Sequence, residues 1–182
     1  MAGFEYRGQL NGSENPVTLH CTIKNSATIK VGDMVYNDSA GITRAAAGAT
    51  NPVLGVCVGI VNDDGIDLDN ANPSSYDGAW TSSTQTYVAA SDNMTDKKVK
   101  AIVIADPFAI WYNDADGDFT NPADEYLHCD LADHDQVDES ETTEDDGQVF
   151  ILKLDPDEDG DASKCLVTIS APQLFSFERE TH

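Results

Sequence analysis

The stretch from Thr22 to Val61, TIKNSATIKVGDMVYNDSAGITRAAAGATNPVLGVCVGIV, contains the pattern that decides the fold. Short apolar segments alternate here with turns of small and polar residues, and each apolar segment has the length of a strand. Gly32 precedes one of these segments and Gly41 follows a turn, where the conformational freedom of glycine is useful. The stretch therefore predicts a compact β-meander.

Its last segment, Val53–Val61, is the longest predicted strand of the meander. Strict alternation puts the bulky residues on one face, namely Leu54, Val56, Val58 and Ile60. The opposite face carries the small residues Gly55, Cys57 and Gly59. A flat face of this kind predicts that another backbone or sheet lies close against it.

Upstream, residues 17–23 show the cleanest alternation in the chain. They predict a half-buried strand with an inward face made of Val17, Leu19, Cys21 and Ile23. Further strands are predicted at residues 84–90, 99–105, 148–154 and 164–170. The predicted fold is all-β, a compact barrel or sandwich with long acidic loop insertions. We expect an N-terminal arm at residues 1–15 and one domain at residues 16–182, with acidic loops at 62–80 and 130–147.

A family resemblance lies in residues 26–61, SATIKVGDMVYNDSAGITRAAAGATNPVLGVCVGIV. The elements that carry it are Gly-Asp followed by two apolar residues, Ser-x-Gly, an alanine-rich segment, and the final Val-x-x-Gly pattern. This arrangement resembles the N-terminal β-module of the small capsid decoration, or cement, proteins of tailed phages and related viruses. Weaker echoes occur in residues 90–107 and 164–174.

The resemblance implies a β-tulip-like module that binds the exterior of the assembled icosahedral capsid and stabilises the shell. It implies the major capsid protein as partner, and self-association with a trimer favoured over a dimer. The protein would be made in the host cytoplasm and would end on the outer surface of the virion. An alternative from another class is a secreted β-sandwich module that binds calcium or carbohydrate.

The charge balance excludes some classes of function. Asp and Glu number 33 against 10 Lys and Arg, which gives a formal net charge of −23. A nucleic-acid-binding surface needs a cationic track, and the only dense one is Lys97, Lys98 and Lys100. No apolar run approaches the roughly 20 residues of a membrane span, and Glu5 and Arg7 interrupt any signal-peptide core. Adaptation to concentrated salt and an ordinary acidic surface both remain open interpretations.

The search for catalytic chemistry gives no motif. Nucleophile-elbow, P-loop, zinc-protease and dinucleotide-binding signatures do not occur in the sequence, so we expect no enzymatic activity and no cofactor. Four cysteines are widely spaced and are predicted to be buried thiols. His20-Cys21 and His128-Cys129 are poor zinc ligands, because adjacent residues on a strand point to opposite faces.

One connector resembles the start of a calcium-binding loop. Asp155, Asp157 and Asp159 occupy its first, third and fifth positions, and Gly160 the sixth. The position of the closing glutamate holds Leu166 instead. A loosely bound Ca²⁺ or other cation and a plain acidic turn are the two interpretations.

Apolar residues near the two ends are the predicted contacts to the capsid or to a sister subunit. They are Phe4, Tyr6, Leu174, Phe175 and Phe177. Binding surfaces are depleted of charge at their centres, and exposed apolar side chains in a terminal segment are a liability in a free monomer. The alternative is that residues 174–177 form the last core strand.

Overall fold

The computed structural model describes residues 3–48, 52–71, 77–143, 147–155 and 162–170. Nearly all of the regular structure in these ranges is strand, which confirms the predicted all-β class. The helical elements described are two single turns, η2 (Asn93–Lys97) and η3 (Pro122–Asp124). None of the described helices has the length and apolarity that crossing a membrane requires.

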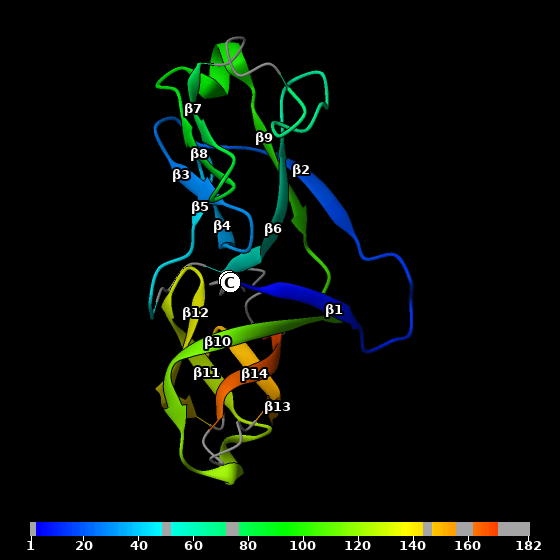
Figure 1. Cartoon of the computed structure of the whole chain (residues 1–182), viewed down its shortest axis with the longest axis vertical. Helices are drawn as coiled ribbons and strands as arrows, with labels where there is room; N and C mark the ends of the chain where they lie inside the picture. The colour runs from blue at the N-terminus through cyan, green and yellow to red at the C-terminus, as the bar shows by residue number, and fades with distance from the viewer. Residues whose placement is uncertain (1–2, 49–51, 72–76, 144–146, 156–161, 171–182) are drawn as a thin grey trace, which may run out of the picture.

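A closed five-stranded barrel forms the lower part of the molecule in Figure 1. Its strands pair in the order β10-β12-β11-β13-β14, and β14 pairs with β10 again to close the ring. Their bounds are β10 (Ala109–Phe119), β11 (His128–Asp133), β12 (Gln136–Thr143), β13 (Val149–Asp155) and β14 (Ala162–Ile169). Strand β1 (Glu5–Gln9) pairs antiparallel with β10 beside the ring.

Two further sheets form the upper part of the molecule (Figure 1). The larger has the order β2-β9-β6-β4-β5, with β2 (Thr18–Thr22), β4 (Met34–Asp38), β5 (Gly41–Arg44), β6 (Val53–Val61) and β9 (Lys100–Ile104). The smaller has the order β3-β8-β7, with β3 (Thr28–Lys30), β7 (Gly78–Thr81) and β8 (Thr86–Ala89). The predicted meander thus supplies β4, β5 and β6.

Two hydrophobic cores hold the molecule together. One joins the two upper sheets and includes Ile29 and Tyr87 from the small sheet and Val103 from the large one. The other fills the barrel around Trp111. Four residues of the large upper sheet belong to the barrel core, namely Met34, Val53, Val56 and Ile104. Because burial of apolar area is the main stabilising term, these four residues couple the two parts.

Strand β6 is buried on both faces and so serves both cores, and a register shift exchanges the two faces along the strand. The pairing of β6 with β9 slips between Cys57 and Gly59, so the alternation of faces is interrupted there. Val56 consequently packs in the barrel core, whereas Ile60 packs in the upper core. The prediction that these two residues share a face is therefore wrong. The predicted close approach is confirmed at Gly55, where an added Cβ would collide with the backbone of Ile104.

Residues 5–9 are not a free arm. They form β1, which pairs with β10 of the same chain from Glu5 opposite Tyr112 to Gln9 opposite Ala109. The prediction of a separate N-terminal arm is wrong for this strand. The sequence signal for the arm was the alternation of apolar with charged residues. The strand edge to which these residues bind is that of β10 in the same chain.

The predicted acidic loop at 130–147 is also corrected. Strands β11 and β12 form a hairpin there, in which Leu131 and Val137 are fully buried. Acidic side chains on the outer face outnumbered these inward residues and concealed their alternation. The loop predicted at 62–80 is irregular over residues 62–71, as expected, but residues 78–80 belong to β7.

Candidate functional site

The start of β2 and the residue that precedes it expose apolar side chains to solvent. Val17 is 55% exposed and Leu19 is 40% exposed, whereas Ile23 is fully buried. The sequence predicted all three to face inward. Strand β2 lies at the margin of its sheet and takes β9 as its partner, whereas Ile23, just after the strand, is bridged to Ile42 and lies in the upper core.

Two more exposed apolar residues lie beside this strand. Leu10 is 54% exposed and Phe108 is 47% exposed. The backbone N–H of Leu10 donates to the carbonyl of Phe108 at 2.9 Å, and that of Ala105 donates to the carbonyl of Val17 at 2.9 Å. We call the set Leu10, Val17, Leu19 and Phe108 the β2 edge.

Asp106 holds the segments of the β2 edge in place. Its carboxylate accepts hydrogen bonds from the Gln9 side chain at 2.6 Å, from the Val17 backbone at 3.0 Å and from the Phe108 backbone at 2.9 Å. Asp106 itself is only 5% exposed. A buried carboxylate is stable when it is fully hydrogen-bonded in this way, and the three donors fix the end of β1, the start of β2 and the turn into β10.

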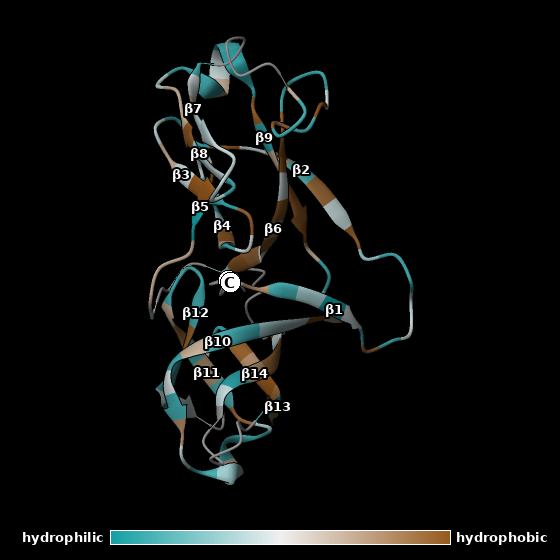
Figure 2. Ribbon diagram, in the orientation of Figure 1, coloured by the Kyte–Doolittle hydropathy of each residue, from teal (hydrophilic) through white to brown (hydrophobic). Residues whose placement is uncertain are grey.

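The β2 edge is poor in charge, in contrast to the chain as a whole. Residues 16–23, PVTLHCTI, contain no acidic or basic residue other than a histidine, although the net charge is −23. Figure 2 shows apolar segments along β2, whereas the turns at the two ends of the molecule are mostly hydrophilic. An exposed apolar strip with a charge-poor centre and an unpaired strand side is typical of a protein-binding surface.

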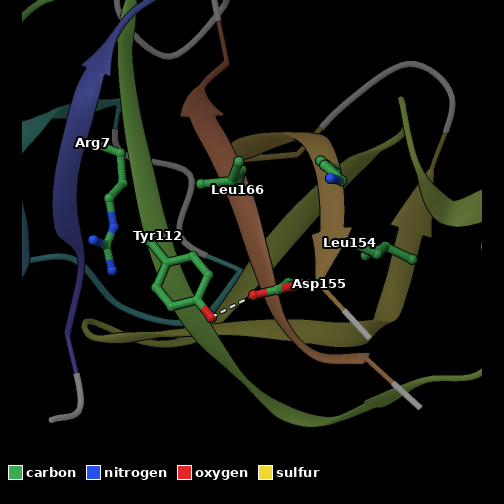
Figure 3. A pocket seen from close by; sticks show the side chains of 6 residues that line it. Arg7, Tyr112, Leu154, Asp155 and Leu166 are labelled. Carbon is green, nitrogen blue, oxygen red and sulfur yellow. Dashed lines mark hydrogen bonds between the residues drawn. The ribbon is translucent and has the colours of Figure 1, made fainter. Parts of the chain in front are cut away.

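A second feature is a groove on the barrel, with a volume of about 370 Å³. Figure 3 shows Arg7, Tyr112, Asp155 and Leu166 around it. The Tyr112 hydroxyl donates to the Asp155 carboxylate at 2.8 Å, and this bond raises the pKa of Tyr112 to about 12. The Arg7 guanidinium lies 4.8 Å from the centre of the Tyr112 ring and pairs with Glu5 at 2.8 Å. The polar groups of the groove thus largely satisfy one another.

A third feature joins the barrel to the upper sheets. Asp33, in the turn between β3 and β4, lies against His134 and Asp135, in the turn between β11 and β12. The Met34 backbone N–H donates to the His134 carbonyl at 2.8 Å. One possible ligand atom from each of the three side chains lies within 4.8 Å of the other two. We call this group the junction cluster.

A second group of acids lies on the barrel and consists of Asp116, Asp138 and Glu139. The hydrogen bond with Asp116 raises the pKa of Glu139, because the two carboxyls share a proton more easily than two charges can coexist. Asp116 is exposed, and the other two are half-buried. The bond with Asp116 accounts for one side of Glu139, and Oε2 of Glu139 is buried without a hydrogen-bond partner among the described residues.

The structure places the residues that the sequence singled out as follows. Phe4 is 4% exposed and lies in the barrel core, and Tyr6 packs edge to face on Trp111 at 5.6 Å. Both side chains therefore pack within their own chain, and the expected interface residue Phe4 has no free surface. Leu174, Phe175 and Phe177 lie outside the described residues.

The expected cation loop is described only at its first residue. Asp155 ends β13 and is turned to the Tyr112 hydroxyl, whereas Asp157 and Asp159 lie outside the described residues. Three cysteines, Cys57, Cys129 and Cys165, are buried as free thiols, which confirms the expectation for Cys165, and Cys21 is half-buried. Burial raises the pKa of Cys57 and of Cys165 to about 12.

The sequence did not reveal two of these features. The sequence signal for the β2 edge was the absence of charge from residues 16–23. The order of residues along a strand does not show which of its side chains other elements cover. The junction cluster had none, because its aspartate and histidine come from turns that are far apart in the chain. Comparison with known proteins gives no match to a protein-family model, to a curated protein or to a solved structure.

Proposed function

We propose that this chain is a structural protein of a virion that binds the exterior of an assembled icosahedral capsid and stabilises the shell. The observation that carries the proposal is the β2 edge, an exposed, charge-poor apolar strip on a protein with a net charge of −23. Such a strip marks a surface that another protein covers. The resemblance of residues 26–61 to capsid decoration proteins supplies the class of partner, the major capsid protein.

The rest of the molecule suits this role. A closed barrel shares a core with the upper sheets, which gives a body that transmits force with little deformation. The net charge of −23 favours solubility at the high local density of a capsid lattice. We propose that the chain acts by binding alone, without catalysis or cofactor, and that it self-associates on the shell, where a trimer is favoured over a dimer.

Sedimentation with capsid shells tests the proposal. The purified chain is mixed with shells assembled from the major capsid protein encoded near its gene, and separately with the unassembled capsid protein. We expect saturable binding to shells, and shells that resist higher temperature when they are occupied. Failure to co-sediment with any assembled shell contradicts the proposal.

Matched variants locate the contact. Val17→Asp together with Leu19→Asp places two charges in the β2 edge and should weaken shell binding at least about tenfold, because each buried unpaired charge is strongly unfavourable. Val88→Asp is the control, since Val88 is 41% exposed on the small upper sheet, away from this edge. Equal loss of binding in the control would show that charge itself is responsible, and unchanged binding of the double variant would rule out the β2 edge.

A further inference from the structure

We propose that the junction cluster binds one divalent transition-metal ion, with Zn²⁺ as its representative, through Asp33, His134 and Asp135. This site is independent of the proposed capsid function. It would link the β3–β4 turn of the upper sheets to the β11–β12 turn of the barrel. One buried carboxylate, one oriented imidazole and the spacing between them support this site.

Asp33 carries a buried oxygen that the protein leaves unsatisfied. Its side chain is 0% exposed. Oδ2 accepts hydrogen bonds from the Lys30 backbone N–H at 2.6 Å and from the Arg44 Nε at 2.6 Å. Oδ1 has no hydrogen-bond partner among the described residues and lies 3.7 Å from Nε2 of His134. A buried carboxylate oxygen without a donor is strongly unfavourable, and a cation on Oδ1 removes that penalty.

His134 is oriented as a metal ligand. Its Nδ1 is hydrogen-bonded to the neighbouring Asp133 carboxylate, so the tautomer that donates there leaves Nε2, 3.7 Å from Asp33 Oδ1, as the nitrogen free to bind a metal. A carboxylate that holds the distal nitrogen of a ligating histidine is the usual outer partner at zinc sites. The His134 side chain is 14% exposed, so solvent has limited access to this nitrogen.

The spacing fits a small ion. Zinc binds nitrogen and oxygen ligands at about 2.0–2.2 Å, so tetrahedral ligand atoms lie about 3.3–3.6 Å apart. The 3.7 Å between Asp33 Oδ1 and His134 Nε2 is close to this value. A carboxylate oxygen of Asp135, the third ligand, lies within 4.8 Å of one ligand atom of each of the other two residues, and its Oδ1 is 3.8 Å from His134 Nδ1. Three protein ligands leave a fourth position for water.

The local charge also favours a dication. Three carboxylates, those of Asp33, Asp133 and Asp135, surround the His134 imidazole. The Arg44 guanidinium pairs with Asp33 at 2.6 Å, and the Lys30 ammonium lies 3.5 Å from Oδ2 of Asp135. With the uncharged imidazole that metal binding requires, the three carboxylates, Arg44 and Lys30 sum to one negative charge before the ion binds. An imidazole ligand selects a transition metal over Ca²⁺ or Mg²⁺, which prefer oxygen.

The test uses the full chain after treatment with EDTA and dialysis. Isothermal titration with ZnCl₂ should give one site per chain, and Co²⁺ should give a visible spectrum without a thiolate charge-transfer band. Zn²⁺ should raise the melting temperature beyond a control with Mg²⁺ at the same ionic strength, because the ion binds the folded state.

Variants identify the ligands. His134→Gln and Asp135→Asn should each lower Zn²⁺ affinity at least about tenfold. Asp133→Asn should lower it about 10- to 100-fold, because Asp133 acts only by orienting the His134 imidazole. His128→Gln is the matched histidine control, since His128 lies against Ser170 instead, and Asp138→Asn is the matched carboxylate control. Both should bind as the wild type does. Circular dichroism checks that each variant is folded.

Three results overturn the proposal. They are no saturable Zn²⁺ binding by the folded wild type, unchanged affinity in folded His134→Gln, and Ca²⁺ binding as tight as Zn²⁺ binding at the same site.

Discussion

The side-chain amide of Gln9 donates a 2.6 Å hydrogen bond to the carboxylate of Asp106, which joins the end of β1 to the turn between β9 and β10. The same carboxylate accepts the backbone N–H groups of Val17 and Phe108. One buried acid thus fixes the backbone on which the β2 edge is built. A change at this residue should therefore affect both stability and binding.

Asp106→Ala should lower the free energy of unfolding by about 2–4 kcal/mol, because three donors to a buried charged acceptor lose their partner. Urea denaturation followed by circular dichroism measures the change. Asp96→Ala is the control, since Asp96 is exposed on η2, and it should stay within about 0.5 kcal/mol of the wild type. Equal effects of the two substitutions would contradict the role given to Asp106.

Gly55→Ala and Gly59→Ala should differ although both lie on β6. A Cβ at Gly55 would collide with the backbone carbonyl of Ile104, whereas a Cβ at Gly59 would meet the flexible end of Ile102 at an ordinary 3.4 Å. Overpacking against backbone should cost about 1–3 kcal/mol at Gly55, with little change at Gly59. Chemical denaturation of the two variants side by side decides this, and the reverse order would contradict the packing described.

Tyr112 should titrate late and weaken the fold at high pH. Its pKa in the folded protein is about 12, raised from 10.0 mainly by the hydrogen bond to Asp155. The stabilising contribution is present in full below pH 10 and is lost as the pH rises through about 12, because the unfolded chain releases this proton first. Solvent screens the exposed pair, so the effect on stability should be small.

Absorbance titration of tyrosinate checks this expectation. The difference between the wild type and Tyr112→Phe should contain one group that titrates near pH 12. A difference curve centred near 10 would show that the hydrogen bond to Asp155 does not form in solution.

The four thiols should react at very different rates. Cys57, Cys129 and Cys165 are buried and Cys21 is half-buried, and burial raises the pKa of each, so little thiolate is present at neutral pH. A disulfide reagent added to the folded protein should modify Cys21 first and the other three only on unfolding. Cys21→Ser should remove the early phase, and rapid reaction of several thiols in that variant would contradict the buried cores.

Salt should stabilise the chain. A net charge of −23 produces self-repulsion, and the screening length falls from about 10 Å at 0.1 M to about 3 Å at 1 M salt. The melting temperature should therefore rise with NaCl over this range. A melting temperature that is independent of salt would favour the ordinary acidic surface over adaptation to concentrated salt.

The sequence by itself determined the β class and most of the strands. Alternation along residues 53–61 and the turns at Gly32 and Gly41 specify a meander whatever lies around it, because side-chain direction along a strand is a local property. The same holds for the buried Cys165 and for the close approach at Gly55, which follow from residue type and strand phase.

Only the tertiary structure decided which face is covered and which turns meet. Val17 and Ile23 have the same phase in the sequence, yet Val17 is exposed and Ile23 is buried, because only Ile23 lies in the upper core, where it is bridged to Ile42. A register slip after Cys57 puts Val56 and Ile60 of β6 in different cores, and β1 pairs with its own barrel instead of projecting as an arm. Asp33 and His134 come together because two distant turns dock on each other. Non-local packing produces these arrangements, and no local pattern of residues encodes them.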